Sequence, residues 1–284
     1  MDSSIRTNEF KKDTKLEYIF DVINHSNGLQ EFSDQSFADC ADFYKNIIII
    51  PIPRTGSTYL HQLLASKLEI SYPSNLMARF YNLPLIGAYI QSELFGIDYH
   101  RFIHYKSKYG TSEGLYQPHE FGYFWTKYIY PDNPHTHESF NFDNNNALNI
   151  EALNAVLLRI SSIFANHVVY KFAMGIYFMD VLARLENTIF VTIERHDEEI
   201  YRSMLTARYD RLGSHDAWWS LRPKNYSELL ELSPLEQVKQ QVKSLRLHLE
   251  RARHKLSDRF LTIQYSDLVG CPDDVVCYIK EQIE

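Results

Sequence analysis

The sequence predicts an α/β protein in which a parallel β-sheet is flanked by helices. Short apolar segments alternate along the chain with longer segments whose apolar residues recur every three or four positions. The first apolar segment, residues 44–52, contains four consecutive isoleucines from Ile47 to Ile50, which is typical of a strand buried on both faces. Right-handed crossovers should then gather the loops that follow the strands at one edge of the sheet, where ligands usually bind.

The later elements follow the same alternation. A helix should begin near Ser57, because leucines recur at helical spacing after it. Further strands are expected at residues 167–172, 188–193 and 260–265, and further helices at 148–165, 177–185, 197–212 and 273–283. Ser233, Pro234 and Glu236 have the spacing of a capping box and predict the start of another, long helix.

One domain spanning residues 1–284 is expected, because no internal repeat or long linker divides the chain. Residues 71–146 interrupt the alternation and are rich in aromatic residues, Pro, Gly and Asn. We expect an irregular insertion there that forms a lid or wall over an acceptor site. Its rings would suit a phenol, a polyketide, a lipid alcohol or the face of a sugar, and many would equally suit a core.

Composition excludes several classes of protein. With 45% apolar residues, 20 tyrosines and 17 phenylalanines, the chain can build a large core and is not disordered. A net charge of −7 argues against a protein that coats nucleic acid or anionic membrane. No apolar run reaches the ~18 residues of a membrane span, no apolar signal core is present, and three cysteines are too few for a disulfide framework. A soluble, cytoplasmic protein is expected, of unknown oligomeric state.

The turn after the first strand has the composition of an anion-binding loop. It reads Pro53-Arg54-Thr55-Gly56-Ser57-Thr58-Tyr59. Gly56 allows the backbone to approach a ligand, Ser57 and Thr58 add hydroxyls at a helix N-terminus, and Arg54 adds a charge. A tight strand-to-helix turn with a hydroxyl cap would have the same composition. The loop is not a Walker A loop, because no Lys follows the glycine, so an ATP or GTP hydrolase fits poorly.

A second cation follows another predicted strand. Arg195 comes two residues after the strand at 188–193, and Ser203 lies eight residues later in the next predicted helix. A guanidinium and a hydroxyl suit a phosphate that carries about two charges. The pattern is weak by itself, because Arg195 would equally pair with Glu194 or Glu199.

Together these segments resemble the sulfotransferases that use 3′-phosphoadenosine 5′-phosphosulfate (PAPS). Residues 53–58 match the family's 5′-phosphosulfate loop, and Arg195 and Ser203 match its 3′-phosphate motif. Tyr59 stands where cytosolic members carry a Trp that stacks on adenine, and Lys171 matches a Lys that assists at the bridging oxygen.

The resemblance covers roughly residues 46–70 and 166–283. The insertion looks more like bacterial members than like the cytosolic branch. The stretch that carries this likeness is Gln117-Pro118-His119-Glu120-Phe121-Gly122-Tyr123-Phe124.

The resemblance implies a P-loop-like sheet and an enzyme that moves the sulfuryl group in line from PAPS to an acceptor, leaving PAP. The acceptor would be a hydroxyl or amine of a small molecule, lipid or carbohydrate. Arg54 and the loop N–H groups would neutralise the leaving oxygen, with help from Lys171. No metal is expected, and His135 and His137, in a loop rich in Pro and Asn, should face solvent.

The general base departs from the family pattern. Ala173 stands where the cytosolic branch has its catalytic His, and residues 72–75, where other branches have a Glu, contain no carboxylate. His119 and Glu120 are the best candidates, because they are adjacent titratable groups in the segment expected to form the acceptor site. The lesser candidates are Arg79 and His104.

Two other functions stay open from the sequence. One is a nucleotide kinase or another phosphotransferase, although the loop lacks the usual Lys and no acidic metal ligand clearly follows a strand. The other is a non-catalytic protein that binds PAP, because the family's His is missing.

Overall fold

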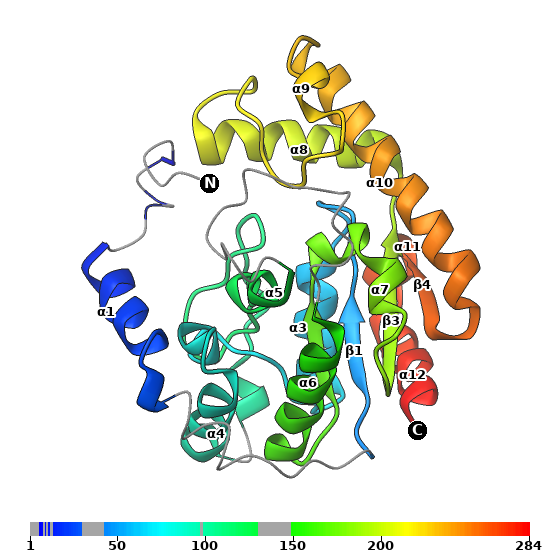
Figure 1. Ribbon diagram of the computed structural model, residues 1–284. Helices are drawn as coiled ribbons and strands as arrows, with labels where there is room; N and C mark the ends of the chain where they lie inside the picture. Colours follow the sequence, from blue (N-terminus) through cyan, green and yellow to red (C-terminus); the bar gives the residue numbers. More distant parts are fainter. Residues whose placement is uncertain are drawn as a thin grey trace.

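A computed structural model gives the fold of this protein (Figure 1). It describes residues 6, 7, 9, 11, 14–29, 43–96, 99–129 and 149–284. Four strands form one sheet: β1 (Asn46–Ile49), β2 (Val168–Lys171), β3 (Thr188–Glu194) and β4 (Phe260–Gln264). Their order is β2-β1-β3-β4, and every neighbouring pair is parallel. The predicted fold class is therefore confirmed.

Helices cover both faces of this sheet (Figure 1). The α-helices are α1 (Thr14–Asn24), α3 (Ser57–Lys67), α4 (Pro84–Phe95), α5 (Gly122–Ile129), α6 (Ile150–Phe164), α7 (Met179–Leu182), α8 (Asp197–Leu212), α9 (Tyr226–Leu229), α10 (Pro234–Leu256), α11 (Tyr265–Gly270) and α12 (Pro272–Ile283). Short 3₁₀ segments are η3 (Met77–Phe80), η4 (Tyr99–Phe102), η6 (Ala173–Tyr177) and η7 (Ser257–Arg259). No helix in the described ranges is long and apolar enough to cross a membrane.

The isoleucines of β1, with Ile50 directly after the strand, explain why the sheet is covered on both sides. Ile48 and Ile50 belong to the core built with α6 and α10, whereas Ile47 and Ile49 belong to the core built with α3 and α12. All four side chains are inaccessible to solvent. Successive residues of a strand point to opposite faces, so an unbroken apolar run is what a doubly covered strand requires.

Most predicted helices occur close to the expected positions. The serine half of the capping box is present: the Ser233 hydroxyl accepts a hydrogen bond from the Glu236 N–H at 3.4 Å, and Pro234 takes the first helical position of α10. The helix expected at 177–185 is instead the 3₁₀ segment η6 followed by the four-residue helix α7. Gly175 lies in η6, where an added Cβ would fall 2.7 Å from the side chain of Ile50.

The expectation that residues 71–146 are irregular is wrong for α4 and α5. Helix α4 begins at Pro84 and buries six residues along one side, but its apolar residues also occur on the other sides, where Tyr89 and Leu94 are exposed. A helix that is apolar on most sides shows no 3.6-residue alternation, so its sequence lacks the usual signal. Gly87 allows close packing there, because a Cβ would lie 3.0 Å from Cβ of Phe80.

Candidate active site

The loop between β1 and α3 is stabilised by contacts within itself and by two residues with positive φ angles. Arg54 and Gly56 have positive φ angles of 70° and 92°, and the buried Thr55 hydroxyl donates to the Ile52 carbonyl at 2.8 Å. The Thr55 hydroxyl therefore serves the loop itself. An added Cβ at Gly56 would lie 3.0 Å from the ring of Tyr265, so both the backbone angle and the available space require glycine.

The amino end of α3 opens onto this loop. Its N-cap residue is Gly56, and no side chain caps the helix there. The first N–H groups of a helix need partners, and together with the helix dipole they favour an anion. Ser57, the first helical residue, is buried, and the Thr58 hydroxyl accepts a hydrogen bond from Lys171 Nζ at 3.2 Å.

Lys171 contacts both Thr58, at the amino end of α3, and Glu120, the acidic candidate for the general base. It ends β2, is only 6% exposed, and forms an ion pair with Glu120 at 3.3 Å. Thr58, Lys171 and Glu120 thus form one continuous row of polar side chains. A hydroxyl, an ammonium and a carboxylate lie in sequence along it.

Glu120 comes to Lys171 because its segment pairs with residues 72–75. Ser74 and Pro118 form an antiparallel bridge, and the His119 N–H donates to the Pro73 carbonyl at 2.8 Å. This pairing places the Glu120 carboxylate beside residues 72–75, which contain no carboxylate.

His119 is held by a hydrogen bond that fixes the character of its ring. Its Nδ1 accepts from the Phe121 N–H at 2.8 Å. A backbone N–H can only donate, so Nδ1 is unprotonated and the neutral ring carries its proton on Nε2. In this form His119 offers a donor to its surroundings, whereas the Glu120 carboxylate offers acceptors.

The second predicted motif meets the first. Arg195 Nη1 donates to the backbone carbonyl of Arg54 at 2.9 Å, and Arg54 Nε donates to the Ser203 hydroxyl at 2.8 Å. The Arg195 guanidinium lies 4.1 Å from the centre of the Tyr265 ring and also pairs with Glu199 at 2.8 Å. The predicted pairing with Glu199 is thus present together with the contact to the loop.

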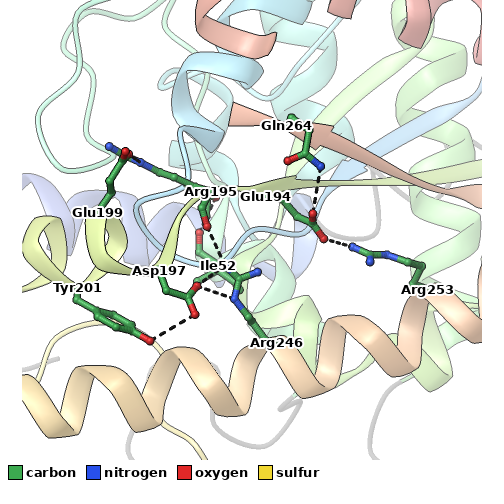
Figure 2. A network of polar contacts seen from close by, with 10 residues as sticks. Ile52, Glu194, Arg195, Asp197, Glu199, Tyr201, Arg246, Arg253 and Gln264 are labelled. Carbon is green, nitrogen blue, oxygen red and sulfur yellow. Dashed lines mark hydrogen bonds and ion pairs between the residues drawn. The ribbon is translucent and has the colours of Figure 1, made fainter. Parts of the chain in front are cut away.

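Side chains of helix α10 bind the end of β3 (Figure 2). Arg246 Nη2 donates to the Arg195 carbonyl at 2.8 Å and also bonds the Asp197 carboxylate. Arg253 pairs with Glu194 at 2.5 Å. Hydrogen bonds from Arg253 and Gln264 keep the pKa of Glu194 below its usual value. Glu194 is thus bound by α10, whereas Arg195 pairs with Glu199.

The aromatic candidate Tyr59 pairs with a ring from the insertion. Its centroid lies 5.7 Å from that of Tyr105, at an interplanar angle of 57°. Both side chains are at least partly accessible. Two partly exposed rings beside a cationic loop offer apolar faces to a planar ligand.

Some candidates lie away from this cluster. Arg79 pairs with Glu17 of α1 at 3.1 Å, and His104 Nε2 bonds the Glu113 carbonyl at 2.9 Å. Neither shares a contact with Lys171. His135 and His137 fall outside the residues that the structure describes, and within those residues no group of three potential metal ligands occurs.

The site contains residues that sequence reasoning missed. Tyr265 directly follows β4, so the rule that ligands bind beyond the carboxyl ends of strands would have found it. Arg211 lies two turns after Ser203 on α8. His61 is buried behind Lys171, and burial together with the charges of Lys171 and His119 lowers its pKa to about 3. Nothing local in the sequence marks Tyr109, whose ring lies 5.0 Å from the Arg54 guanidinium.

The architecture is that of an α/β protein with a cationic, glycine-containing loop at the carboxyl edge of its parallel sheet. The sequence profile of the sulfotransferase family matches residues 46–284, and the chain therefore belongs to the sulfotransferase family. Family and fold support sulfuryl transfer as its general reaction.

Two solved structures share this fold. Sulfotransferase STF1 from Mycobacterium tuberculosis H37Rv is 13% identical with a TM-score of 0.55, over 90% of this chain and 72% of that chain. Sulfotransferase STF9 from Mycobacterium avium is 13% identical with a TM-score of 0.53, over 89% of this chain and 67% of that chain. At such identities the similarity shows the fold alone. No curated protein sequence matches the chain.

Proposed function

We propose that this protein transfers the sulfuryl group of PAPS to a hydroxyl or amine of an organic acceptor, and that PAP is its product. The observation that carries the proposal is the direct contact between the two cationic segments, Arg195 Nη1 to the Arg54 carbonyl at 2.9 Å. PAPS carries phosphate at both ends of its ribose, so a donor site needs two adjacent anion-binding places.

Arg195 and Ser203 would hold the 3′-phosphate. Burial lowers the pKa of Arg54, and the nearby charge of Arg195 lowers it further, because two close guanidinium groups repel. A phosphate between them would relieve that repulsion. Arg54 Nε donates to the Ser203 hydroxyl in this structure. When PAPS binds, Arg54 and Ser203 would exchange this hydrogen bond for bonds to oxygens of PAPS. The rings of Tyr59 and Tyr105 would enclose the adenine.

The 5′-phosphosulfate would lie against the amino end of α3. There the acceptor oxygen or nitrogen attacks sulfur, a new S–O or S–N bond forms, and the bond from sulfur to the bridging oxygen breaks. The electron pair of that bond stays on the 5′-phosphate of PAP. Lys171, which donates to the Thr58 hydroxyl at 3.2 Å, would offset the charge that develops on the leaving oxygen.

Glu120 would remove the acceptor proton. Its carboxylate lies 3.3 Å from Lys171, next to the place of transfer. His119 serves this purpose less well, because its Nδ1 lone pair is engaged by the Phe121 N–H. Of the two candidates, the structure therefore favours Glu120. The carboxylate would come from a segment paired with residues 72–75 rather than from those residues themselves.

The row of Thr58, Lys171 and Glu120 would suit an acceptor whose hydroxyl or amine reaches Glu120. That acceptor would be a small molecule, a lipid or a carbohydrate. A test of the function is the release of PAP from PAPS with a panel of phenols, lipid alcohols and sugars, alongside thermal shifts with PAP, ATP and GTP. Stabilisation by PAP above ATP and GTP, with acceptor-dependent PAP release, supports the proposal. Preferential stabilisation by ATP or GTP would overturn it.

A further inference from the structure

A β-hairpin from the insertion lies on the candidate site. The backbones of Lys108 and Thr111 exchange hydrogen bonds of 2.9 Å and 3.1 Å. The two residues between them, Tyr109 and Gly110, both have positive φ angles, of 50° and 84°. Positive φ at both central positions identifies a two-residue turn of the I′ type.

This turn contacts the groups that would surround the transferring sulfur. A Cβ added to Gly110 would lie 3.7 Å from Lys171 Nζ and 3.8 Å from the Thr58 hydroxyl, so the backbone of the turn packs directly over both. The ring of Tyr109 faces the Arg54 guanidinium, 5.0 Å from its centre. The backbone carbonyl of Tyr109 accepts a hydrogen bond from Arg211 Nη1 at 3.0 Å.

Arg211 joins the two sides of the site. It lies in the last turn of α8, the helix that also carries Ser203. Burial lowers the pKa of Arg211, the charge of Arg6 lowers it further, and Glu120 opposes the effect. Arg54 also lowers it. These influences show that its guanidinium lies within electrostatic reach of both the loop cation and the acidic candidate.

Three cations therefore surround one turn: Arg54, Lys171 and Arg211. Like charges brought together in a partly buried place repel one another. The Tyr109 carbonyl offers the Arg211 guanidinium only a partial negative charge. An oxygen of an anion offers more, and a guanidinium binds it through stronger, charge-assisted hydrogen bonds.

We propose that Arg211 binds the sulfuryl group of the donor, and that the carbonyl of Tyr109 occupies the place of a sulfuryl oxygen in the empty site. This inference rests on the proposed function. When PAPS binds, the turn withdraws, and Arg211 exchanges the Tyr109 carbonyl for a sulfuryl oxygen. PAP lacks the sulfuryl group, so Arg211 distinguishes PAPS from PAP and favours exchange of the product for fresh donor.

The test measures the affinities of PAPS and PAP separately by calorimetry, without acceptor. In R211Q, PAPS should bind about tenfold more weakly, the scale of one lost charge-assisted hydrogen bond, whereas the PAP affinity should stay within about twofold. R184Q is the matched control, because Arg184 pairs with Glu151 in an exposed ion pair just before β3, at the opposite end of the strands. It should leave both affinities unchanged.

An unchanged ratio of the PAPS and PAP affinities in R211Q would overturn the inference, and so would an equal loss of both. Should R211Q fail to show a cooperative thermal transition, R211K replaces it. R211K keeps the charge but loses the paired N–H donors of the guanidinium. The ratio of PAPS affinity to PAP affinity should then fall about threefold or more. An unchanged ratio contradicts the inference. A wild-type protein that binds neither nucleotide would overturn the proposed function, and this inference with it.

Discussion

At the scale of single residues, the pair His119 and Glu120 shows how a hydrogen bond decides between two adjacent candidates. From the sequence, both residues lie in the segment that is expected to form the acceptor site. The distinction comes from the Phe121 N–H, which engages His119 Nδ1, and from Lys171, which pairs with Glu120. A proton acceptor needs an available lone pair, and of these two side chains the Glu120 carboxylate presents one to Lys171, whereas the Nδ1 lone pair of His119 is engaged.

The first prediction separates these two residues. E120Q keeps the shape of the side chain and removes the basic oxygen, so turnover should fall about 10²-fold or more while PAP affinity stays near that of the wild type. H119N keeps an acceptor for the Phe121 N–H, and its turnover should stay within about threefold. Steady-state rates of PAP release, with calorimetry for binding, measure both. A slow H119N beside a fast E120Q would reverse the assignment.

The second prediction concerns the buried His61, whose Nε2 lies 3.2 Å from the Val169 carbonyl. Its pKa is lowered to about 3 in the folded protein, mainly by burial and then by the charge of Lys171. As the pH falls below the ordinary value of 6.5, the unfolded chain takes up a proton that the folded protein refuses. Stability is therefore lost as the pH falls from 6.5 toward 3.

Lowering the pH from 7.5 to 5 should cost about 2 kcal/mol of unfolding free energy through His61 alone. H61Q should reduce the difference in stability between these two pH values by that amount. Urea unfolding at both pH values measures it. H254Q, at an exposed position on α10, is the control and should leave the difference unchanged. An equal pH dependence in H61Q and the wild type would contradict this explanation.

At the scale of secondary-structure elements, the strands could be predicted and parts of the insertion could not. Three buried isoleucines in β1 and Ile50 directly after it pack alternately into two cores, as a doubly covered strand requires, so this unbroken apolar run identified the element. Helix α4 escaped because its apolar residues surround the axis. The hairpin turn escaped as well, because Tyr109-Gly110 is not one of the strong turn dipeptides, and its contact with Arg54 depends on distant packing.

The third prediction tests the loop between β1 and α3 as an element. G56A introduces a Cβ where φ is 92° and the Tyr265 ring lies 3.0 Å away. The loop must shift, and we expect PAP affinity to fall about tenfold or more, together with a stability loss of about 1–2 kcal/mol. G213A is the comparison, because Gly213 also has positive φ but no atom within 4 Å of an added Cβ. Similar PAP affinities in both variants would contradict a role for the loop in binding.

At the scale of the whole molecule, the edge rule for parallel sheets predicted that residues far apart in sequence would meet. Arg54 and Arg195 follow neighbouring strands β1 and β3, and their segments are in direct contact. The contacts of Arg246 and Arg253 on α10 with the end of β3 were not predicted (Figure 2). In the sequence these two arginines look like ordinary surface charges of a long helix. Such pairings depend on how α10 crosses the sheet, which no local pattern specifies.

The central claim is that one nucleotide spans both cationic segments, and the affinity for its 3′-phosphate tests it most directly. PAP and adenosine 5′-phosphate differ only in that group, so calorimetry should be done with both ligands on the wild type and on R195A. We expect PAP to bind the wild type about tenfold or more tightly than adenosine 5′-phosphate, and R195A to lose most of this preference. Equal affinities in the wild type, or a full preference kept by R195A, would contradict the claim.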